Sequence, residues 1–199
     1  MPTPPQNSVH PKSLAGWRRW LKAHHTQKEG VWLIMYRKAT GKPRVEYVEA
    51  VEEALCYGWI DSTARVLDEA RSMQWFSPRK KGSGWSRINR RRVEQLIAAG
   101  RMTPAGLAKV EAAKLSGDWS SLDAFESLEV PPDLAAALSA YENAESYFEA
   151  FPHSAKFIIL HWIAAAKTPA TRAKRIAETA SLAAQNIRAH QYRPKQDTN

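Results

Sequence analysis

The sequence holds a single cysteine and has no long apolar run. Because Cys56 is the only cysteine among the 199 residues, no disulfide can form within the chain. A lone cysteine is typical of a reducing compartment, and we expect a cytoplasmic protein. The apolar runs at 31–36 and 157–166 are far shorter than the roughly 18 to 20 residues that cross a bilayer. We therefore expect no membrane insertion.

Short motifs of catalysis and of metal binding are also missing. The chain has no Gly-x-Ser-x-Gly elbow, no P-loop and no Gly-x-Gly-x-x-Gly loop. Its six histidines are scattered, and neither a His pair four residues apart nor a Cys/His cluster has the spacing of metal ligands. We therefore expect no metal and no cofactor. Cys56 lies in an apolar helical pattern, which predicts a buried structural thiol. Whether the protein is an enzyme stays open, and the missing motifs lean against it.

The chain is basic, and its charge is segregated. It carries 29 Lys/Arg and 20 Asp/Glu, a formal net charge of +9. Residues 65–101 hold ten basic and three acidic side chains, whereas residues 102–151 hold two basic and nine acidic ones. Segregation of this kind indicates either a surface for anions or an internal contact between these two segments. The sequence leaves both interpretations open.

The pattern of apolar residues predicts an α+β fold, with a small sheet and packed helices in the N-terminal part and an all-helical C-terminal region. Residues 31–36 form a β-rich run without alternation, and extended pieces at 64–67 and 73–76 are expected to join them in the sheet. By residue range, we expect a disordered lead-in at 1–12, an α+β domain at 13–120, a linker at 121–132, a helical region at 133–188 and a frayed tail at 189–199.

Several helix starts are marked by capping residues. Ser13, Ser86 and the Thr-Pro pairs at 103–104 and 168–169 predict helix N-termini, since a side-chain oxygen there accepts a hydrogen bond from the first turn. Asp133 is expected to cap a helix in the same way. The helices predicted from apolar periodicity include 46–57, 86–98, 133–140, 142–151, 154–167 and 170–188.

The segment from Trp75 to Arg92 combines a predicted strand end, a glycine-bearing basic loop and a helix start. A helix N-terminus attracts anions because its first N–H groups have no partner within the helix. Arg87, Arg90 and Arg91 nevertheless crowd that end, which is unfavourable by roughly 0.3 to 1 kcal/mol for each cation unless an anion compensates. A broken local preference of this kind indicates function, so we expect the segment to bind an anion.

Two other interpretations of this segment stay open. In the first, Trp75 and Trp85 are core anchors, and the arginines pair with the acidic face of the 46–57 helix or with residues 102–151. In the second, the protein binds nucleic acid through the basic loop and helix from Ser77 to Arg92. The start of that loop, Ser-Pro-Arg-Lys, is similar to short basic turns that lie in a DNA minor groove.

Asp61 follows Gly58-Trp59-Ile60 at a helix-to-strand turn that could aim its carboxylate into a cleft. Beside Arg79, the carboxylate would orient the guanidinium, and a desolvated carboxylate would act as a base. An uncharacterised enzyme that uses Asp61 is therefore a further alternative. The simpler interpretation is a structural aspartate that caps a turn.

Five groups of residues form a longer pattern when they are taken together. They are 49–61, 76–80 with Trp85, Ser86 and Asn89, 100–106, 161–163 and 168–176. This pattern resembles the YdeI/OmpD-associated family, also called bacteriocin-protection proteins, from Trp17 to about Leu182. The resemblance implies an α+β N-terminal part before a helical region, and a role in tolerance of bacteriocins or cationic antimicrobial peptides. It implies no established enzyme activity, and a porin partner only through the family name.

The sequence thus predicts a cytoplasmic protein, associated with stress or antimicrobial resistance, that binds a small anionic or phosphorylated ligand in a basic, Trp-lined cleft. Arg79 and Lys80 would bind the anion, Ser86 would cap it, and Trp85 would stack on the ligand. The residues expected to form the cleft are Tyr57, Trp59, Asp61, Arg79, Lys80, Trp85, Ser86 and Asn89.

Overall fold

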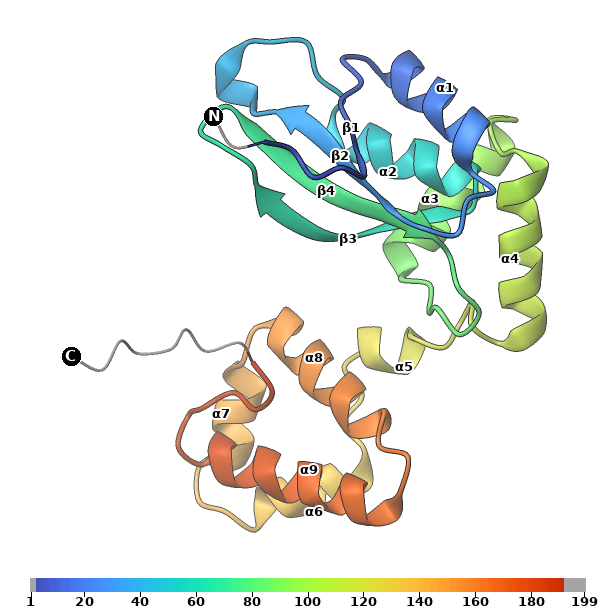
Figure 1. The fold of residues 1–199 in the computed structure, drawn as a ribbon. Helices are drawn as coiled ribbons and strands as arrows, with labels where there is room; N and C mark the ends of the chain where they lie inside the picture. The colour runs from blue at the N-terminus through green and yellow to red at the C-terminus, as the bar shows by residue number, and fades with distance from the viewer. Residues whose placement is uncertain (1–2, 192–199) are drawn as a thin grey trace. The chain divides into compact units, whose positions relative to one another are not determined.

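A computed structural model of the protein describes residues 3–191 and divides the chain into two compact units (Figure 1). The first unit ends at Leu122 and the second begins at Asp123, inside the segment expected as a linker. The first unit contains the sheet, and the regular elements described in the second are all helices. The predicted α+β class with a helical C-terminal region is therefore confirmed.

The sheet of the first unit has four strands in the order β1-β2-β4-β3. They are β1 (Ser8–Val9), β2 (Val31–Tyr36), β3 (Trp59–Val66) and β4 (Arg71–Pro78). β1 runs parallel to β2, and the other two pairs are antiparallel. The register of β3 on β4 shifts between Asp61 and Ala64, which marks an irregularity of the β-bulge kind. The extended pieces expected at 64–67 and 73–76 thus belong to longer strands.

The expected disordered lead-in is not what the structure shows for residues 3–12. Ser8 and Val9 form β1, paired with Trp32 and Leu33 of β2, and the backbone N–H of Trp32 donates to the carbonyl of Asn7. The sequence signal was missed because a two-residue strand carries no periodicity of its own. Residues 1 and 2 lie outside the described residues.

Four helices and a short 3-10 turn complete the first unit. They are α1 (Leu14–His24), η1 (Lys38–Thr40), α2 (Tyr47–Cys56), α3 (Arg87–Ala98) and α4 (Pro104–Ser116). The predicted starts at Ser13, Ser86 and Thr103 are confirmed, because each side-chain oxygen accepts a hydrogen bond from the backbone N–H three residues later. Such caps satisfy donors that the first helical turn leaves without partners.

The main core lies between one face of the sheet and the helices. Strand residues Leu33 and Phe76 are fully buried there, together with Trp17 of α1, Leu55 of α2 and Val93 of α3. The opposite face carries a smaller cluster of Trp32, Ile34 and Met73, with Trp75 half-buried beside it. β2 therefore buries side chains on both faces, as its continuous apolar run predicted.

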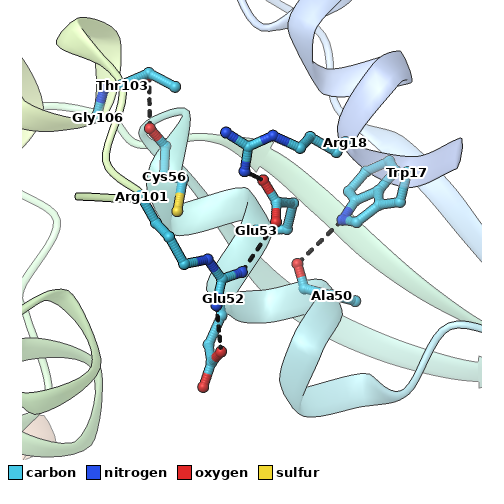
Figure 2. A network of polar contacts seen from close by, with 9 residues as sticks. All are labelled: Trp17, Arg18, Ala50, Glu52, Glu53, Cys56, Arg101, Thr103 and Gly106. Atoms are coloured by element: carbon cyan, nitrogen blue, oxygen red, sulfur yellow. Dashed lines mark hydrogen bonds and ion pairs between the residues drawn. The ribbon is translucent and has the colours of Figure 1, made fainter. Parts of the chain in front are cut away.

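A buried carboxylate joins three parts of the first unit (Figure 2). Glu53 of α2, which is 1% exposed, forms ion pairs with Arg18 of α1 and with Arg101, whose Nη2 lies 3.1 Å from Oε2. Glu52 adds a second contact to Arg101 at 3.5 Å. Burial, with Glu53 nearby, raises the pKa of the Cys56 thiol to about 11. Cys56 is thus a neutral core thiol.

The second unit is built from α5 (Asp123–Glu126), α6 (Pro132–Ser139), α7 (Ala144–Ala150), α8 (His153–Ala164) and α9 (Pro169–Ala183). α5 occupies part of the expected linker. Thr168 caps α9 as predicted. The prediction for Asp133 was wrong, because Pro131 holds the cap position of α6. The Asp133 carboxylate accepts from the N–H of Leu134 at 3.0 Å and binds Arg172 of α9.

The helices of the second unit surround a core of their own. Its fully buried members include Leu134 of α6, Ile159 and Ile163 of α8, and Ala180 of α9. Of the expected frayed tail, Ala189 is buried and residues 192–199 lie outside the described residues. Within 3–191, the longest apolar helices still fall short of what a membrane span requires.

Candidate anion-binding site

The basic loop after β4 is held at its start by the end of α2. The backbone N–H of Arg79 donates to the carbonyl of Gly58 over 2.9 Å. Gly58 has a φ of +75°, a left-handed conformation that suits glycine, and a Cβ there would lie 2.7 Å from Cγ of Lys109. A glycine at this position therefore allows three segments, the end of α2, the loop and α4, to meet.

α4 reaches this position through a close approach to α2. Thr103 donates to the carbonyl of Cys56 through both its backbone N–H (3.1 Å) and its hydroxyl (2.7 Å). A Cβ on Gly106 would lie 2.3 Å from the same carbonyl oxygen, so only glycine fits there (Figure 2). These contacts set the position of Lys109, about one turn further along α4.

Arg79 is buried inside the loop that it begins. Its side chain is 4% exposed, and its guanidinium lies 3.5 Å from the centroid of the Trp85 ring. Nη1 is within long hydrogen-bond distance of the Ser83 hydroxyl (3.4 Å) and the Gly84 carbonyl (3.3 Å). Nε is buried without a partner. Stacking on an indole, rather than an ion pair, therefore holds this guanidinium in place.

The positive charge of Arg79 lacks a direct counter-ion. Among residues 3–191, no carboxylate lies within ion-pair distance of its guanidinium. Burial lowers the pKa of Arg79 to about 10, and the more distant charge of Asp61 only partly opposes this shift. The group is still a cation at neutral pH. A buried cation without a partner is unfavourable, and an incoming anion would relieve it.

Two pockets of about 550 Å³ each open beside Arg79. The first is lined by the loop and α4: Arg79, Lys80, Lys81, Ser83, Trp85, Lys109, Ala112, Ala113, Leu115, Ser116 and Asp118. The second is lined by His25, Thr26, Gln27, Lys28, Tyr57, Gly58, Pro78, Arg79, Lys80, Ala105 and Lys109. Arg79, Lys80 and Lys109 line both pockets, and we call them the shared cations.

The two pockets differ in their acidic groups. The second adds Lys28 to the shared cations, and its lining includes no carboxylate. The first adds Lys81 and also contains Asp118. Both linings are therefore net positive, which raises the local concentration of anions.

Asp118 fastens the loop to the end of α4. Its Oδ2 accepts hydrogen bonds from the backbone N–H of Gly82 (3.0 Å) and from the Ser116 hydroxyl (2.8 Å). Its carbonyl accepts from the N–H of Trp85 at 3.3 Å. The basic loop is thus tied through backbone donors to the acidic 102–151 segment, a contact between the two segments as one interpretation of the charge segregation suggested.

The structure brings some of the predicted cleft residues together. Arg79, Lys80 and Trp85 line the first pocket, and Tyr57 lines the second. The face of Trp85 expected to stack on a ligand carries Arg79, and Trp119 packs against the same ring system with centroids 5.1 Å apart. Trp85 therefore positions the guanidinium.

The other predicted cleft residues lie elsewhere. Trp59 is fully buried in the core, where its Nε1 donates to the carbonyl of His25 (2.9 Å). Ser86 caps α3, and the Oδ1 atom of Asn89 accepts from Arg92 at 3.0 Å. None of these residues belongs to the lining of either pocket. Trp75, at the start of the predicted segment, packs against Trp32 on the opposite face of the sheet.

Asp61 forms a separate polar group on β3. Its Oδ2 accepts from the Tyr47 hydroxyl (2.6 Å) and from the Gln74 amide (3.2 Å). Burial and the hydrogen bond to Asp61 raise the pKa of Tyr47 to about 12, so the phenol stays protonated. Asp61 lines neither pocket, and its oxygen is engaged by two neutral donors. It influences Arg79 only at a distance.

Sequence reasoning missed several of the lining residues. Lys109 is one of two basic residues in an acidic stretch, and Lys28 follows the end of α1. Neither lies near the basic loop in the chain, and each reaches the site only because helices pack on the sheet. Gly58 and Gly106 could have predicted that α4 packs closely against the end of α2, because glycines near helix ends indicate a close approach of backbones.

Comparison with known families divides the chain. Residues 9–109 match a model described as Domain of unknown function (DUF8412). Residues 127–186 match one described as Bacteriocin-protection, YdeI or OmpD-Associated. The resemblance stated from the sequence is thus confirmed over the C-terminal part, whereas the segments at 49–61 and 76–89 lie within the first match. Comparison with curated proteins and with solved structures gave no match.

Proposed function

The chain belongs to the family of the DUF8412 domain through residues 9–109 and carries a YdeI/OmpD-associated region at 127–186, and from this premise we propose a binding function. The protein binds a small anionic or phosphorylated ligand at the shared cations. It acts in the cytoplasm in stress or antimicrobial resistance. The resistance role rests on the family description, and the binding role rests on the site.

The buried guanidinium of Arg79 is the observation that carries the binding proposal. Its Nε has no partner, no carboxylate neutralises it, and it lines both pockets. A structural arginine would normally pair with a carboxylate when it is this deeply buried. A phosphate is the natural counter-ion, since guanidinium groups bind its oxygens with paired hydrogen bonds.

The net charge favours an indirect role in resistance. A protein with a formal charge of +9 repels cationic peptides, so it is a poor direct trap for them. An intracellular ligand with negative charge is attracted by the same field. We therefore propose that the protein contributes to resistance by binding this anionic ligand, and not by binding the peptides themselves.

The test is calorimetric titration with inorganic phosphate and with n-butyl phosphate. Arg79→Met removes the charge and keeps an apolar side chain of similar length, and the matched control Arg91→Met removes an exposed charge on α3. We expect Arg79→Met to weaken binding by about 10- to 100-fold, because hydrogen bonds to charged groups contribute about 1.5–3 kcal/mol. The control should bind as the wild type does.

The same variant should be at least as stable as the wild type without ligand. Removing an unpaired buried cation offsets the loss of its stacking on Trp85, and we expect the free energy of unfolding to rise by about 1 kcal/mol. Undiminished phosphate binding by Arg79→Met would contradict the proposal. Binding of an oligonucleotide that weakens steeply with salt, and that does not need Arg79, would favour the nucleic-acid alternative instead.

A further inference from the structure

Two cationic segments of the second pocket meet at Gly58. The carbonyl of Gly58 accepts from the N–H of Arg79 at 2.9 Å, at the start of the loop that also carries Lys80. A Cβ at Gly58 would lie 2.7 Å from Cγ of Lys109 on α4, so the stem of this lysine lies directly against the glycine. The three shared cations therefore belong to segments that touch at one residue.

A third cationic segment is held against the two neighbours of Gly58. The indole N–H of Trp59 donates to the carbonyl of His25 over 2.9 Å, and the ring centroids of His25 and Tyr57 lie 5.5 Å apart. The segment continues from His25 to Lys28, and both residues line the second pocket. Lys28 thus joins the shared cations there, in a lining that includes no carboxylate.

The two pockets are lined by different turns of α4, which begins at Pro104 and ends at Ser116. Ala105 in the first turn lines the second pocket, whereas Ala113 and Ser116 in the last turn line the first. A helix carries partial positive charge at its N-terminus and partial negative charge at its C-terminus. The helix therefore favours an anion in the second pocket and opposes one in the first.

Negative groups near the pockets distinguish them further. Asp118 lines the first pocket, and its carboxylate would repel an anion. Beside the second pocket, carbonyls at the end of α1 would have a similar effect, but two of them already have donors. The carbonyl of His24 accepts from the N–H of Gln27 at 3.0 Å, and that of His25 accepts from Trp59. Side-chain charge and helix direction thus both favour the second pocket.

The cations of the second pocket match a ligand with more than one phosphoryl group. They are the shared cations and Lys28, and they include the buried guanidinium of Arg79, whose Nε lacks a partner. A phosphate monoester carries a charge of about −1.5 to −2 at neutral pH, which would neutralise about two of these four cations. A diphosphate supplies a second phosphoryl group and further acceptor oxygens for the others.

We propose that the ligand is bound in the second pocket and carries a diphosphate group, which the shared cations and Lys28 bind together. This inference rests on the proposed anion-binding function and names the pocket and the chemical class of the ligand. The class includes inorganic diphosphate (pyrophosphate) and its organic esters, which share the phosphoryl groups that the cations would recognise.

The first test is calorimetric titration of the wild type with inorganic phosphate and with pyrophosphate, in EDTA so that no metal complex forms. We expect pyrophosphate to bind at least about tenfold more tightly, the effect of one further charge-assisted hydrogen bond. Adenosine diphosphate distinguishes the two sources of the group. Tighter binding than pyrophosphate indicates an ester and weaker binding the free ion, and either result supports the diphosphate class.

Two lysine variants test the choice of pocket. Of the two pockets, Lys28 lines only the second and Lys81 only the first, and both side chains are exposed. Lys28→Met should weaken pyrophosphate binding about tenfold, because it removes a cation that touches the ligand. The matched Lys81→Met should weaken it by less than about twofold, since salt screens charges that do not touch the ligand.

The outcomes separate this inference from the function on which it rests. Equal binding of phosphate and pyrophosphate by the wild type, with both lost in Arg79→Met, would overturn the diphosphate class and leave the anion site standing. A loss in Lys81→Met as large as that in Lys28→Met would overturn the choice of pocket. If neither anion binds the wild type, the proposed function itself fails.

Discussion

Arg79 and Glu53 are two buried charges of the first unit, and they are treated in opposite ways. Glu53 has two arginine partners, Arg18 and Arg101. Arg79 has an indole ring and two long hydrogen bonds. Of these two charges, Arg79 is the one that lines the candidate pockets, and the proposed anion site would account for its missing counter-ion.

The paired charge leads to a prediction about stability. Glu53→Gln keeps the side-chain shape but removes the charge that binds Arg18 and Arg101, and we expect the free energy of unfolding to fall by about 2 kcal/mol. The value lies below that of a fully buried pair because both arginines are partly exposed and regain water. Urea unfolding followed by tryptophan fluorescence measures it.

The matched control is Glu49→Gln, an exposed glutamate on the same helix. It should change the free energy of unfolding by less than about 0.5 kcal/mol. Equal effects of the two substitutions would show that the ion pairs of Glu53 contribute nothing beyond a surface charge on α2.

At the residue scale, the sequence indicated part of the site. The basic loop was predictable, because Arg79 and Lys80 stand beside glycines and a helix cap. The partners of these residues were not predictable, since Lys109 comes from α4 and Lys28 from the segment after α1, and no local pattern describes how these parts pack. Trp85 was predicted to stack on a ligand, but it stacks on Arg79. An aromatic ring beside arginines can bind a ligand or an arginine, and only the structure distinguishes the two.

Helix starts were the most predictable elements. A serine or threonine at the cap acts locally, so Ser13, Ser86, Thr103 and Thr168 could be identified without knowledge of the fold. Strand ends were less predictable, because the length of a strand depends on the strands that it pairs with. β3 and β4 both extend beyond the short runs at 64–67 and 73–76 from which they were predicted. Asp133 was misjudged because its partner lies 39 residues away on α9.

The contact between α6 and α9 predicts a dependence on pH. Arg172 binds Asp133 with two hydrogen bonds, of 2.7 and 2.9 Å, and this holds the pKa of Asp133 below its ordinary value. A lowered carboxyl pKa contributes stability above the unfolded pKa of about 3.9, and that stability is lost as the pH falls through the folded pKa. The pair is partly exposed, so solvent screening limits its contribution to about 0.5 kcal/mol.

Arg172→Gln tests this contact. The pKa of Asp133, measured by NMR titration, should rise toward its ordinary value, and the stability difference from the wild type should be present at pH 7 and vanish in strong acid. Lys174→Gln changes an exposed charge on the same helix and should leave the pKa of Asp133 unchanged. A stability difference that persists below all carboxyl pKa values would show that Arg172 acts through packing instead.

At the scale of the whole molecule, the chain has separate cores. The buried clusters of residues 3–122 and of 123–191 share no member. The first family match ends at residue 109 and the second begins at residue 127, and the boundary between the two units lies between these positions. Structure and family comparison thus divide the chain in the same region.

Separate cores predict separate responses to a local change. Glu53→Gln should speed hydrogen exchange of slowly exchanging amides in α2 and β4, because it destabilises the first unit as a whole. Amides of α8 and α9 should keep the protection of the wild type. A uniform increase across both units would show that they unfold together.

The two outer strands of the sheet have a further consequence for the protein at high concentration. β1 is two residues long, and β3 carries an irregularity between Asp61 and Ala64 with the charged Arg65 next to it. Strands of another molecule add most readily to long, flat and apolar edges. Neither edge of this sheet offers such a template, so the protein is protected against edge-to-edge aggregation.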